Sequence, residues 1–217
     1  MGMRVHELHA AMVHAPLALL PTAAAVDMAA ALSGSRSQAR LGGTLWWVAA
    51  GSGLFAGLAG LAASQEVGAD DESSDMMWLH GIGNVGLIAG AVGLAAWRMT
   101  HKPSVAASTI GLVAAAASTY TAYLGGEMVY GRGVGVERTP RYAGGGVKRQ
   151  ASPPLLSRAA PMTLLRDAVR GLSWLLSRGQ QVVQGRKPID RSAFGLGRSQ
   201  PATADLAPSS DRLPRVV

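Results

Sequence analysis

The sequence predicts an all-α integral membrane protein: an antiparallel four-helix bundle followed by a mostly irregular, basic C-terminal extension. Four apolar runs each reach the length that a helix needs to cross a bilayer, which is about 20 residues. Only 15% of the 217 residues are charged and the mean hydropathy is +0.20, values that are unusual for a soluble globular protein. Charge also changes along the chain. Residues 1–131 carry five basic and eight acidic side chains, net −3, and the remaining residues carry 15 and five, net +10.

The first 131 residues form the predicted membrane domain. Its four spans are expected at about 12–32, 41–64, 78–97 and 104–128. Short polar loops join them, so neighbouring spans should run in opposite directions. The acidic segment 65–75 is expected to be a solvated loop, because its spacing fits no calcium-binding motif. A signal peptide is the rival interpretation of the first span, but its apolar run is longer than an h-region of about 15 residues.

Glycines at helical spacing mark two of the spans. Gly53 and Gly57 lie four residues apart in the second span, and Gly86 and Gly90 do so in the third. Small residues at this spacing let helix backbones approach closely, which matters in lipid because the hydrophobic effect no longer drives helices together.

Residues 132–217 form a second region, rich in Gly, Pro, Ser and Arg, and most of it is expected to lack regular structure. One exception is a predicted amphipathic helix at about 163–178. Its docking side chains are Arg166, Arg170, Leu172, Trp174 and Leu176. A basic amphipathic helix suits a lipid surface or a groove on another subunit. Nucleic-acid binding is not expected, because no recognisable fold or interleaved aromatic residues accompany the charge.

Several chemistries are excluded by composition or by missing motifs. The chain has no cysteine, so disulfides, thiolate metal sites, iron–sulfur clusters held by this chain and covalent c-type haem are ruled out. Nothing resembles a nucleophile triad, a phosphate loop or a paired-carboxylate site. We therefore expect a subunit of a larger assembly rather than an enzyme.

Histidine clustering is the main functional clue. The predicted topology brings a set of polar side chains to one membrane face: His6, His9, His14, His80, Glu127 and Tyr130. His14 and His80 lie two residues into spans one and three, which run parallel in an up-down bundle, so their depths match. Two facing neutral imidazoles are what a bis-histidyl b-type haem requires.

Other uses of these histidines stay open. Imidazoles also form hydrogen bonds between helices or anchor at headgroups, which is the more frequent role. A zinc or copper site would use His9, His14, His80 and Glu127, and a cofactor or quinone headgroup pocket would use the three histidines with Tyr130. His9 and His14 are five residues apart, about 140° around a helix, so both face one ligand only if the helix bends.

Two further polar side chains are placed inside the membrane. Asp27 is expected to pair with Arg36 or Arg40, or to bond to serine and threonine on a neighbouring span, because a proton relay would need partners that the pattern does not offer. Asn84 follows His80 by one helical turn and shares its face.

Three motifs carry a family resemblance: HAAMVHAPLALLPTAAAVD, WLHGIGN at the start of span three, and YLGGEMVYGRGVGV at the end of span four. With them the chain resembles a bacterial four-helix membrane family, domain of unknown function 2231, over about residues 8–136. The motif positions are His9, His14, Pro16, Asp27, His80, Gly125, Gly126, Glu127 and Tyr130. Members often carry a histidine after the final tyrosine, where this chain has Gly131 and Arg132.

The resemblance implies a redox-associated membrane protein, since some members are joined to Rieske-type iron–sulfur domains, but it brings no settled activity. We therefore expect an accessory or structural subunit of a membrane redox or energy-converting complex. The alternatives are an electron carrier with haem b or quinone at His14 and His80, and a metal-binding membrane protein. The expected location is the bacterial inner membrane. The two membrane faces have equal numbers of nearby basic residues, so these residues do not decide the orientation. The arginine-rich tail predicts that both termini are cytoplasmic.

Overall fold

The computed structural model describes residues 3–135, 146–147 and 153–195. Four helical segments are long and apolar enough to cross a membrane: Val5–Ser33, Arg36–Glu66, Asp71–Arg98 and Val105–Gly131. The predicted all-α membrane class is therefore confirmed. Each segment is longer than its apolar run, because polar residues at both ends continue the helix.

The first span is built from two helices, α1 (Val5–Met12) and α2 (His14–Ser33), which meet at Val13. Pro16 lies in the first turn of α2, where a missing backbone N–H is tolerated. Pro21 lies inside α2 and removes one helical hydrogen bond. Gly34 ends the helix with a φ of 69° and donates its N–H to the Ala30 carbonyl, as a left-handed C-terminal cap does.

Polar caps begin the other three spans. Ser35 caps α3 (Arg36–Glu66), Asp70 caps α4 (Asp71–Arg98) and Ser104 caps α5 (Val105–Gly126). In each case the side-chain oxygen accepts a hydrogen bond from the backbone N–H three residues later, which satisfies one orphan donor of the first turn. A short π-helix, η1 (Glu127–Gly131), continues α5.

The acidic segment 65–75 is not an extended solvated loop, which corrects the expectation from its composition. It contains the end of α3, the two-residue strand β1 (Val67–Gly68) and the start of α4. β1 pairs antiparallel with β2 (Gly146–Val147). Asp75 is only 4% exposed, because a residue four positions into α4 already faces the interior of the fold.

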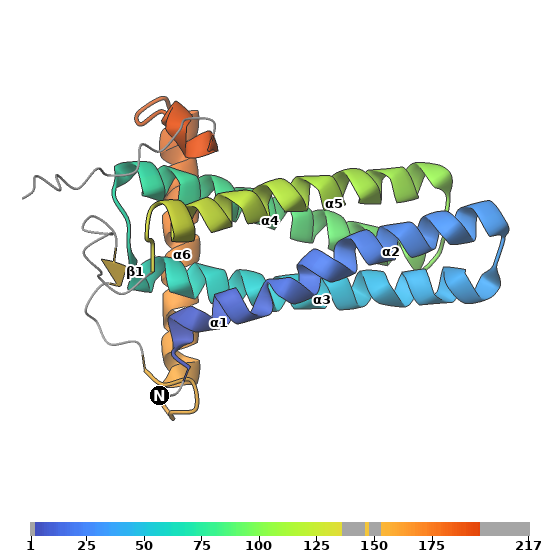
Figure 1. Cartoon of the computed structure of the whole chain (residues 1–217), viewed down its shortest axis with the longest axis horizontal. Helices are drawn as coiled ribbons and strands as arrows, with labels where there is room; N and C mark the ends of the chain where they lie inside the picture. Colours follow the sequence, from blue (N-terminus) through green and yellow to red (C-terminus); the bar gives the residue numbers. More distant parts are fainter. Residues whose placement is uncertain (1–2, 136–145, 148–152, 196–217) are drawn as a thin grey trace, which may run out of the picture.

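Consecutive spans run in alternating directions along the long axis of the molecule (Figure 1). Helix α2 packs on α3 and α5, and α4 packs on the same two helices, so α2 and α4 lie diagonally across the bundle. Gly53 and Gly57 of α3 lie against Ile88 of α4, which is the close approach expected from their spacing. Gly86 and Gly90 instead face open space, with nothing within 4 Å of a Cβ built on either.

Helix α6 (Ala160–Val183) crosses the bundle at the end where the chain begins (Figure 1). It packs mainly on α3. The crossing is very close: a Cβ built on Gly171 would lie 2.1 Å from the Leu61 carbonyl oxygen. Trp78 Nε1 donates to the Leu175 carbonyl at 2.9 Å. The 3₁₀ helix η2 (Arg191–Phe194) follows and packs on α4.

Candidate functional site

A cavity of about 830 Å³ lies at the end of the bundle where α1 and α6 lie, which we call the histidine end. We call this cavity the histidine cavity. Residues of α1, α3, α4, α6 and η1 line it, and most of them are apolar. Its polar lining residues are His6, Glu7, His9, Ser64, His80 and Asn84. Its volume lies in the range of ligand-binding pockets, about 300–1,000 Å³.

The histidine cavity is elongated. On α4 its lining extends from His80 to Gly93, a rise of about 20 Å along a helix axis. Polar groups gather at the His80 end, while the lining toward Gly93 is apolar. The shape therefore suits a molecule with a polar head and a long apolar body.

His9 and His80 meet at the polar end of this cavity. Their ring centroids are 6.1 Å apart and their planes are nearly perpendicular, at 86°. His9 Nδ1 lies 2.9 Å from the Ala56 carbonyl oxygen. A carbonyl only accepts hydrogen bonds, so Nδ1 carries the proton and Nε2 of the neutral ring is left as an acceptor.

His80 is held by a small polar network. Its Nδ1 donates to the Thr121 carbonyl at 2.7 Å, and its Nε2 accepts from Asn84 Nδ2 at 3.1 Å. Thr121 Oγ1 in turn lies 3.1 Å from Asn84 Oδ1. A Cβ built on Gly125 would lie 3.2 Å from His80 Cε1. This glycine, like Gly60 beside His9, gives the imidazole room between helices.

A second polar pair lies nearer the end of the bundle. His6 Nδ1 is 3.5 Å from Glu66 Oε2, and both side chains are largely buried. Among the described residues neither Glu66 oxygen has a hydrogen-bond partner. Outside the spans, Arg132 donates to Glu72 at 2.7 Å, and this hydrogen bond raises the pKa of the Arg132 guanidinium.

A model of the predicted membrane protein family DUF2231 matches residues 5–138. This chain belongs to the DUF2231 family. A comparison with curated proteins finds no match, and neither does a comparison with solved structures. The matched region ends before α6, yet Trp174 and Leu175 of α6 line the histidine cavity. In this DUF2231 protein a segment outside the family match thus completes the cavity wall.

The structure brings His9, rather than His14, to His80. His14 is exposed on the outside of the bundle and does not line the histidine cavity. The helix continues through Val13 with helical backbone angles, so the five-residue offset turns His14 away from the face that His9 occupies. His9 is the histidine at the depth of His80, since their ring centroids are 6.1 Å apart. His14 lies five residues further, about 7.5 Å along the helix axis, and on another face of the helix.

Glu127 and Tyr130 also lie outside the cavity lining, although Met128 and Val129 between them belong to it. Tyr130 is 81% exposed. Within the described part of the chain, no group of three or more His, Asp or Glu side chains is arranged to hold a metal ion. The residues proposed for a metal site are therefore divided between the cavity and the outer surface.

Asp27 lies at the opposite end of the bundle, which we call the basic end. Its Oδ2 accepts from Trp46 Nε1 at 2.9 Å and from Arg98 Nε at 2.8 Å. The expected pairing with Arg36 or Arg40 is wrong, because both of those arginines are exposed on the first turns of α3. Gly42 makes the approach possible: a Cβ there would lie 2.1 Å from Asp27 Oδ1.

Arg98 joins three parts of the bundle. It binds Asp27 of α2, donates from Nη2 to the Ala39 carbonyl of α3 at 2.7 Å, and donates from Nη1 to the His101 carbonyl in the α4–α5 turn. Sequence reasoning missed this role. The available signal was position: Arg98 ends the third span directly after its apolar run.

The predicted docking residues on α6 fall into three groups. Arg166 and Arg170 are exposed and both contact Asp167 of their own helix. Leu172 and Leu176 are 45% and 64% exposed. Trp174 instead turns inward to the histidine cavity.

An ion pair that links α6 to the bundle was not predicted. Arg178 Nη2 lies 2.6 Å from Asp75 Oδ1 of α4, and both side chains are about 5% exposed. Its guanidinium also donates to the carbonyls of Lys187 and Pro188. These acceptors satisfy hydrogen-bond donors of the buried Arg178 guanidinium. Because they belong to both α4 and the segment after α6, the contacts hold α6 against the bundle.

Proposed function

We propose that the protein is a membrane subunit that binds a quinone-class molecule in the histidine cavity, as part of a membrane redox or energy-converting complex. The observation that carries the proposal is the elongated apolar cavity with the His9–His80 pair at one end. A quinone has a polar ring and a long apolar side chain, and the cavity offers a polar end that continues into an apolar groove, with a total length of about 20 Å along α4.

Hydrogen bonding at the polar end favours the reduced, hydroxyl-bearing form. His9 Nε2 is an acceptor because Nδ1 is bound to the Ala56 carbonyl. His80 Nε2 already accepts from Asn84. A quinol hydroxyl could therefore donate to His9, whereas a quinone carbonyl would find the nearby amide hydrogens of Asn84 engaged with His80.

Access from the bilayer supports a lipophilic ligand. Leu54, Leu58 and Val85 line the histidine cavity and are also 50%, 48% and 44% exposed on the outside of the bundle. In a membrane these side chains face acyl chains. A molecule dissolved in the bilayer would then enter between α3 and α4 without crossing water.

A b-type haem fits this arrangement less well. Bis-histidyl ligation needs a free ring nitrogen on both imidazoles, directed at one iron atom. His80 Nε2 is bound to Asn84, and the two rings meet edge to face. His14, the other predicted ligand, is exposed outside the cavity. We therefore place neither haem nor a metal at this site.

Quinol binding can be tested with the full-length protein in detergent, using a quinol with one or two isoprene units and tryptophan fluorescence. Of the five tryptophans Trp174 lies in the cavity wall, so the part of the quenching that is lost in Trp174→Phe reports on the cavity. We expect saturable quenching in the wild type. His9→Leu should lower the affinity for the quinol at least about tenfold, a loss of about 1.4 kcal/mol in binding free energy. His14→Leu is the matched control and should bind normally, because His14 lies outside the cavity. Equal binding by both variants would contradict the proposal.

A second pair of variants tests the apolar groove without touching the histidines. Ala89 lines the cavity, while Ile82 is on the same helix but does not. Ala89→Trp should exclude the side chain of the quinol, and Ile82→Trp should not. An absorption spectrum, oxidised against reduced, is recorded on the same preparation. If the wild type shows a bis-histidyl haem band that is absent from His80→Leu, the site binds haem and the quinol proposal is wrong.

A purely structural subunit is the second candidate, and one observation favours it. Only 11% of the residues in the most apolar stretch of α4 are buried, against 28%, 39% and 28% in the corresponding stretches of the other spans. Gly86 and Gly90 lie open on this helix, as residues at a helix–helix contact would. Because the chain has no cysteine, Gly86→Cys gives a single crosslinking site. It should crosslink to a neighbouring subunit in native membranes, whereas Val113→Cys, on exposed α5 surface, should not.

Orientation stays a prediction. The start of α1 and helix α6 lie at the same end of the bundle (Figure 1), and the residues after 131 carry the excess positive charge. Both features favour placing that end on the cytoplasmic side of the membrane.

A further inference from the structure

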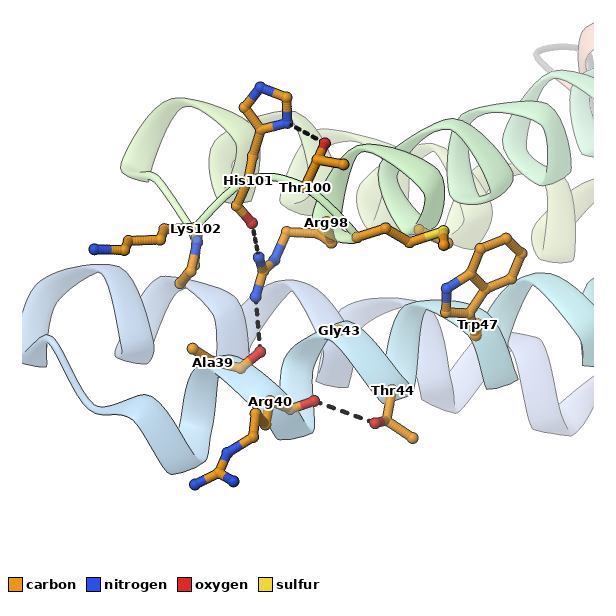
Figure 2. Close-up of a pocket in the computed structure, with 12 residues that line it drawn as sticks. Ala39, Arg40, Gly43, Thr44, Trp47, Arg98, Thr100, His101 and Lys102 are labelled. Atoms are coloured by element: carbon orange, nitrogen blue, oxygen red, sulfur yellow. Dashed lines mark hydrogen bonds between the residues drawn. The ribbon is translucent and has the colours of Figure 1, made fainter.

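A second cavity, of about 460 Å³, lies at the basic end between α3 and the turn that joins α4 to α5. Its polar lining residues are Arg40, Thr44, Arg98, Thr100, His101 and Lys102. Figure 2 shows the Arg40 and Lys102 side chains on one side of Arg98, extending in different directions, with Trp47 on the other side. No acidic residue is part of the lining.

The positive charge available in this cavity comes from Arg40 and Lys102. Arg98 is neutralised by Asp27, and one donor on each of its two terminal nitrogens is engaged by the Ala39 and His101 carbonyls. Among the described residues neither Arg40 nor Lys102 has a salt-bridge partner within 4.0 Å. Two exposed cationic residues therefore line one cavity without a compensating anion, and their long side chains are free to turn toward a bound ligand.

The turn that carries Lys102 is held in place. His101 stacks on Trp97 with ring centroids 4.7 Å apart and planes 7° apart. Its Nδ1 lies 2.8 Å from Thr100 Oγ1 and 3.1 Å from the Trp97 carbonyl oxygen. Arg98 also binds the His101 carbonyl. Lys102 and Arg40 are thus presented from anchored backbone.

Apolar side chains adjoin the same cavity. Trp47 and Met99 line it and are 46% and 71% exposed. Met99 directly follows the Asp71–Arg98 span, and Trp47 lies eleven residues, about 17 Å, into the Arg36–Glu66 span. The apolar wall therefore extends from the membrane face toward the interior of the bilayer. A ligand in this position would place an anionic group near the cations and an apolar chain beside the span.

We propose that this basic cavity binds the phosphate of an acidic phospholipid headgroup, with Arg40 and Lys102 as its two cationic contacts. Arg and Lys are the side chains that recognise phosphate. The juxtaposition of paired cations with Trp47 and Met99 selects a lipid over a free anion, because a soluble phosphate would make no use of the apolar wall.

The test uses the full-length protein in a neutral detergent and counts bound lipid by native mass spectrometry. Dioctanoyl phosphatidylglycerol is titrated against wild type, Arg40→Gln, Lys102→Gln and the double variant. We expect affinity to fall roughly fivefold for each charge removed and roughly thirtyfold for both. Arg36→Gln is the matched control, because Arg36 is exposed on the same helix but does not line the cavity.

Two ligand controls separate the sources of phosphate. Dioctanoyl phosphatidylcholine should bind at least about tenfold more weakly than phosphatidylglycerol, since its headgroup carries no net charge. Glycerol 3-phosphate should not compete at matched concentration. The proposal is overturned if Arg36→Gln weakens binding as much as the cavity variants, if the two lipids bind equally, or if glycerol 3-phosphate competes fully. The comparison of lipids on wild type decides the case even if a variant fails to fold.

Discussion

The two ends of the bundle handle polar groups in different ways. At the basic end Asp27 and Arg98 form a buried ion pair that joins α2, α3 and the α4–α5 turn. At the histidine end a second buried pair, Arg178–Asp75, holds α6, and His9, His80 and Asn84 line a cavity. Buried polar atoms without a hydrogen-bond partner among the described residues occur at both ends, at Asp27 Oδ1 and at both Glu66 oxygens.

The two arrangements have different physical consequences. A buried ion pair with several further hydrogen bonds fixes the positions of the helices that it joins. Polar side chains that line a cavity, as His9 does with its Nε2 acceptor, instead leave capacity for a ligand. We infer that the basic end holds the bundle together in its interior, while the histidine end uses α6 to complete a binding site.

The largest expected effect comes from breaking the Asp27–Arg98 pair. Arg98→Ala leaves the Asp27 carboxylate, which is only 2% exposed, without its counter-ion. Removing one partner of a buried pair costs about 3–5 kcal/mol. Unfolding of the purified protein in mixed micelles measures this loss.

A double variant distinguishes the ion pair from simple loss of packing. Asp27→Leu combined with Arg98→Met removes both charges and should be less destabilised than either single variant. Arg36→Ala, at an exposed position of the same end, should change the unfolding free energy by no more than about 0.5 kcal/mol. If the double variant is as unstable as the sum of the singles, the two side chains are not energetically coupled.

The fold class was predictable because membrane spans are recorded in local composition. Four apolar runs of bilayer length suffice to identify four helices. The caps of α3, α4 and α5 are also local, since Ser35, Asp70 and Ser104 each bond within their own first turn. Counting spans then places His9 and His80 at one end of the bundle.

Partners that are distant in sequence were not predictable. Asp27 and Arg98 are separated by 71 positions, and Asp75 and Arg178 by 103. Helical periodicity tells which residues share a face, but not which helix that face meets. The same limit affected His14: the end of the bundle at which it lies was readable from the sequence, whereas its direction away from His80 depends on how α2 packs between α3 and α5.

An intermediate effect is expected where α6 crosses α3 at the histidine end. Gly171→Ala would place a Cβ 2.1 Å from the Leu61 carbonyl oxygen, which is backbone and cannot move aside. We expect α6 to lift from the bundle at a cost of about 1–3 kcal/mol. Limited proteolysis should then cut α6 while the four spans stay protected.

Gly179 provides the matched control on the same helix. A Cβ there would lie 3.6 Å from Trp78, an ordinary contact distance. Gly179→Ala should therefore be neutral, or stabilising by up to about 1 kcal/mol because alanine is the better helix former. Equal proteolysis of the two variants would show that helix propensity, rather than the close crossing, controls the docking of α6.

The smallest expected effect concerns the surface of the histidine end. Lys187 Nζ lies 2.9 Å from Asp71 Oδ1, but the two side chains are 48% and 92% exposed. An ion pair in water gains little, because solvent screens the charges and two mobile side chains must be ordered. Lys187→Met should therefore lower the unfolding free energy by about 0.5 kcal/mol or less, and this difference should vanish at high salt. Unfolding measured at low and high ionic strength tests both statements. A loss as large as that of Arg98→Ala, unchanged by salt, would mean that the exposed contact holds α6 to the bundle and that the buried Arg178–Asp75 pair does not.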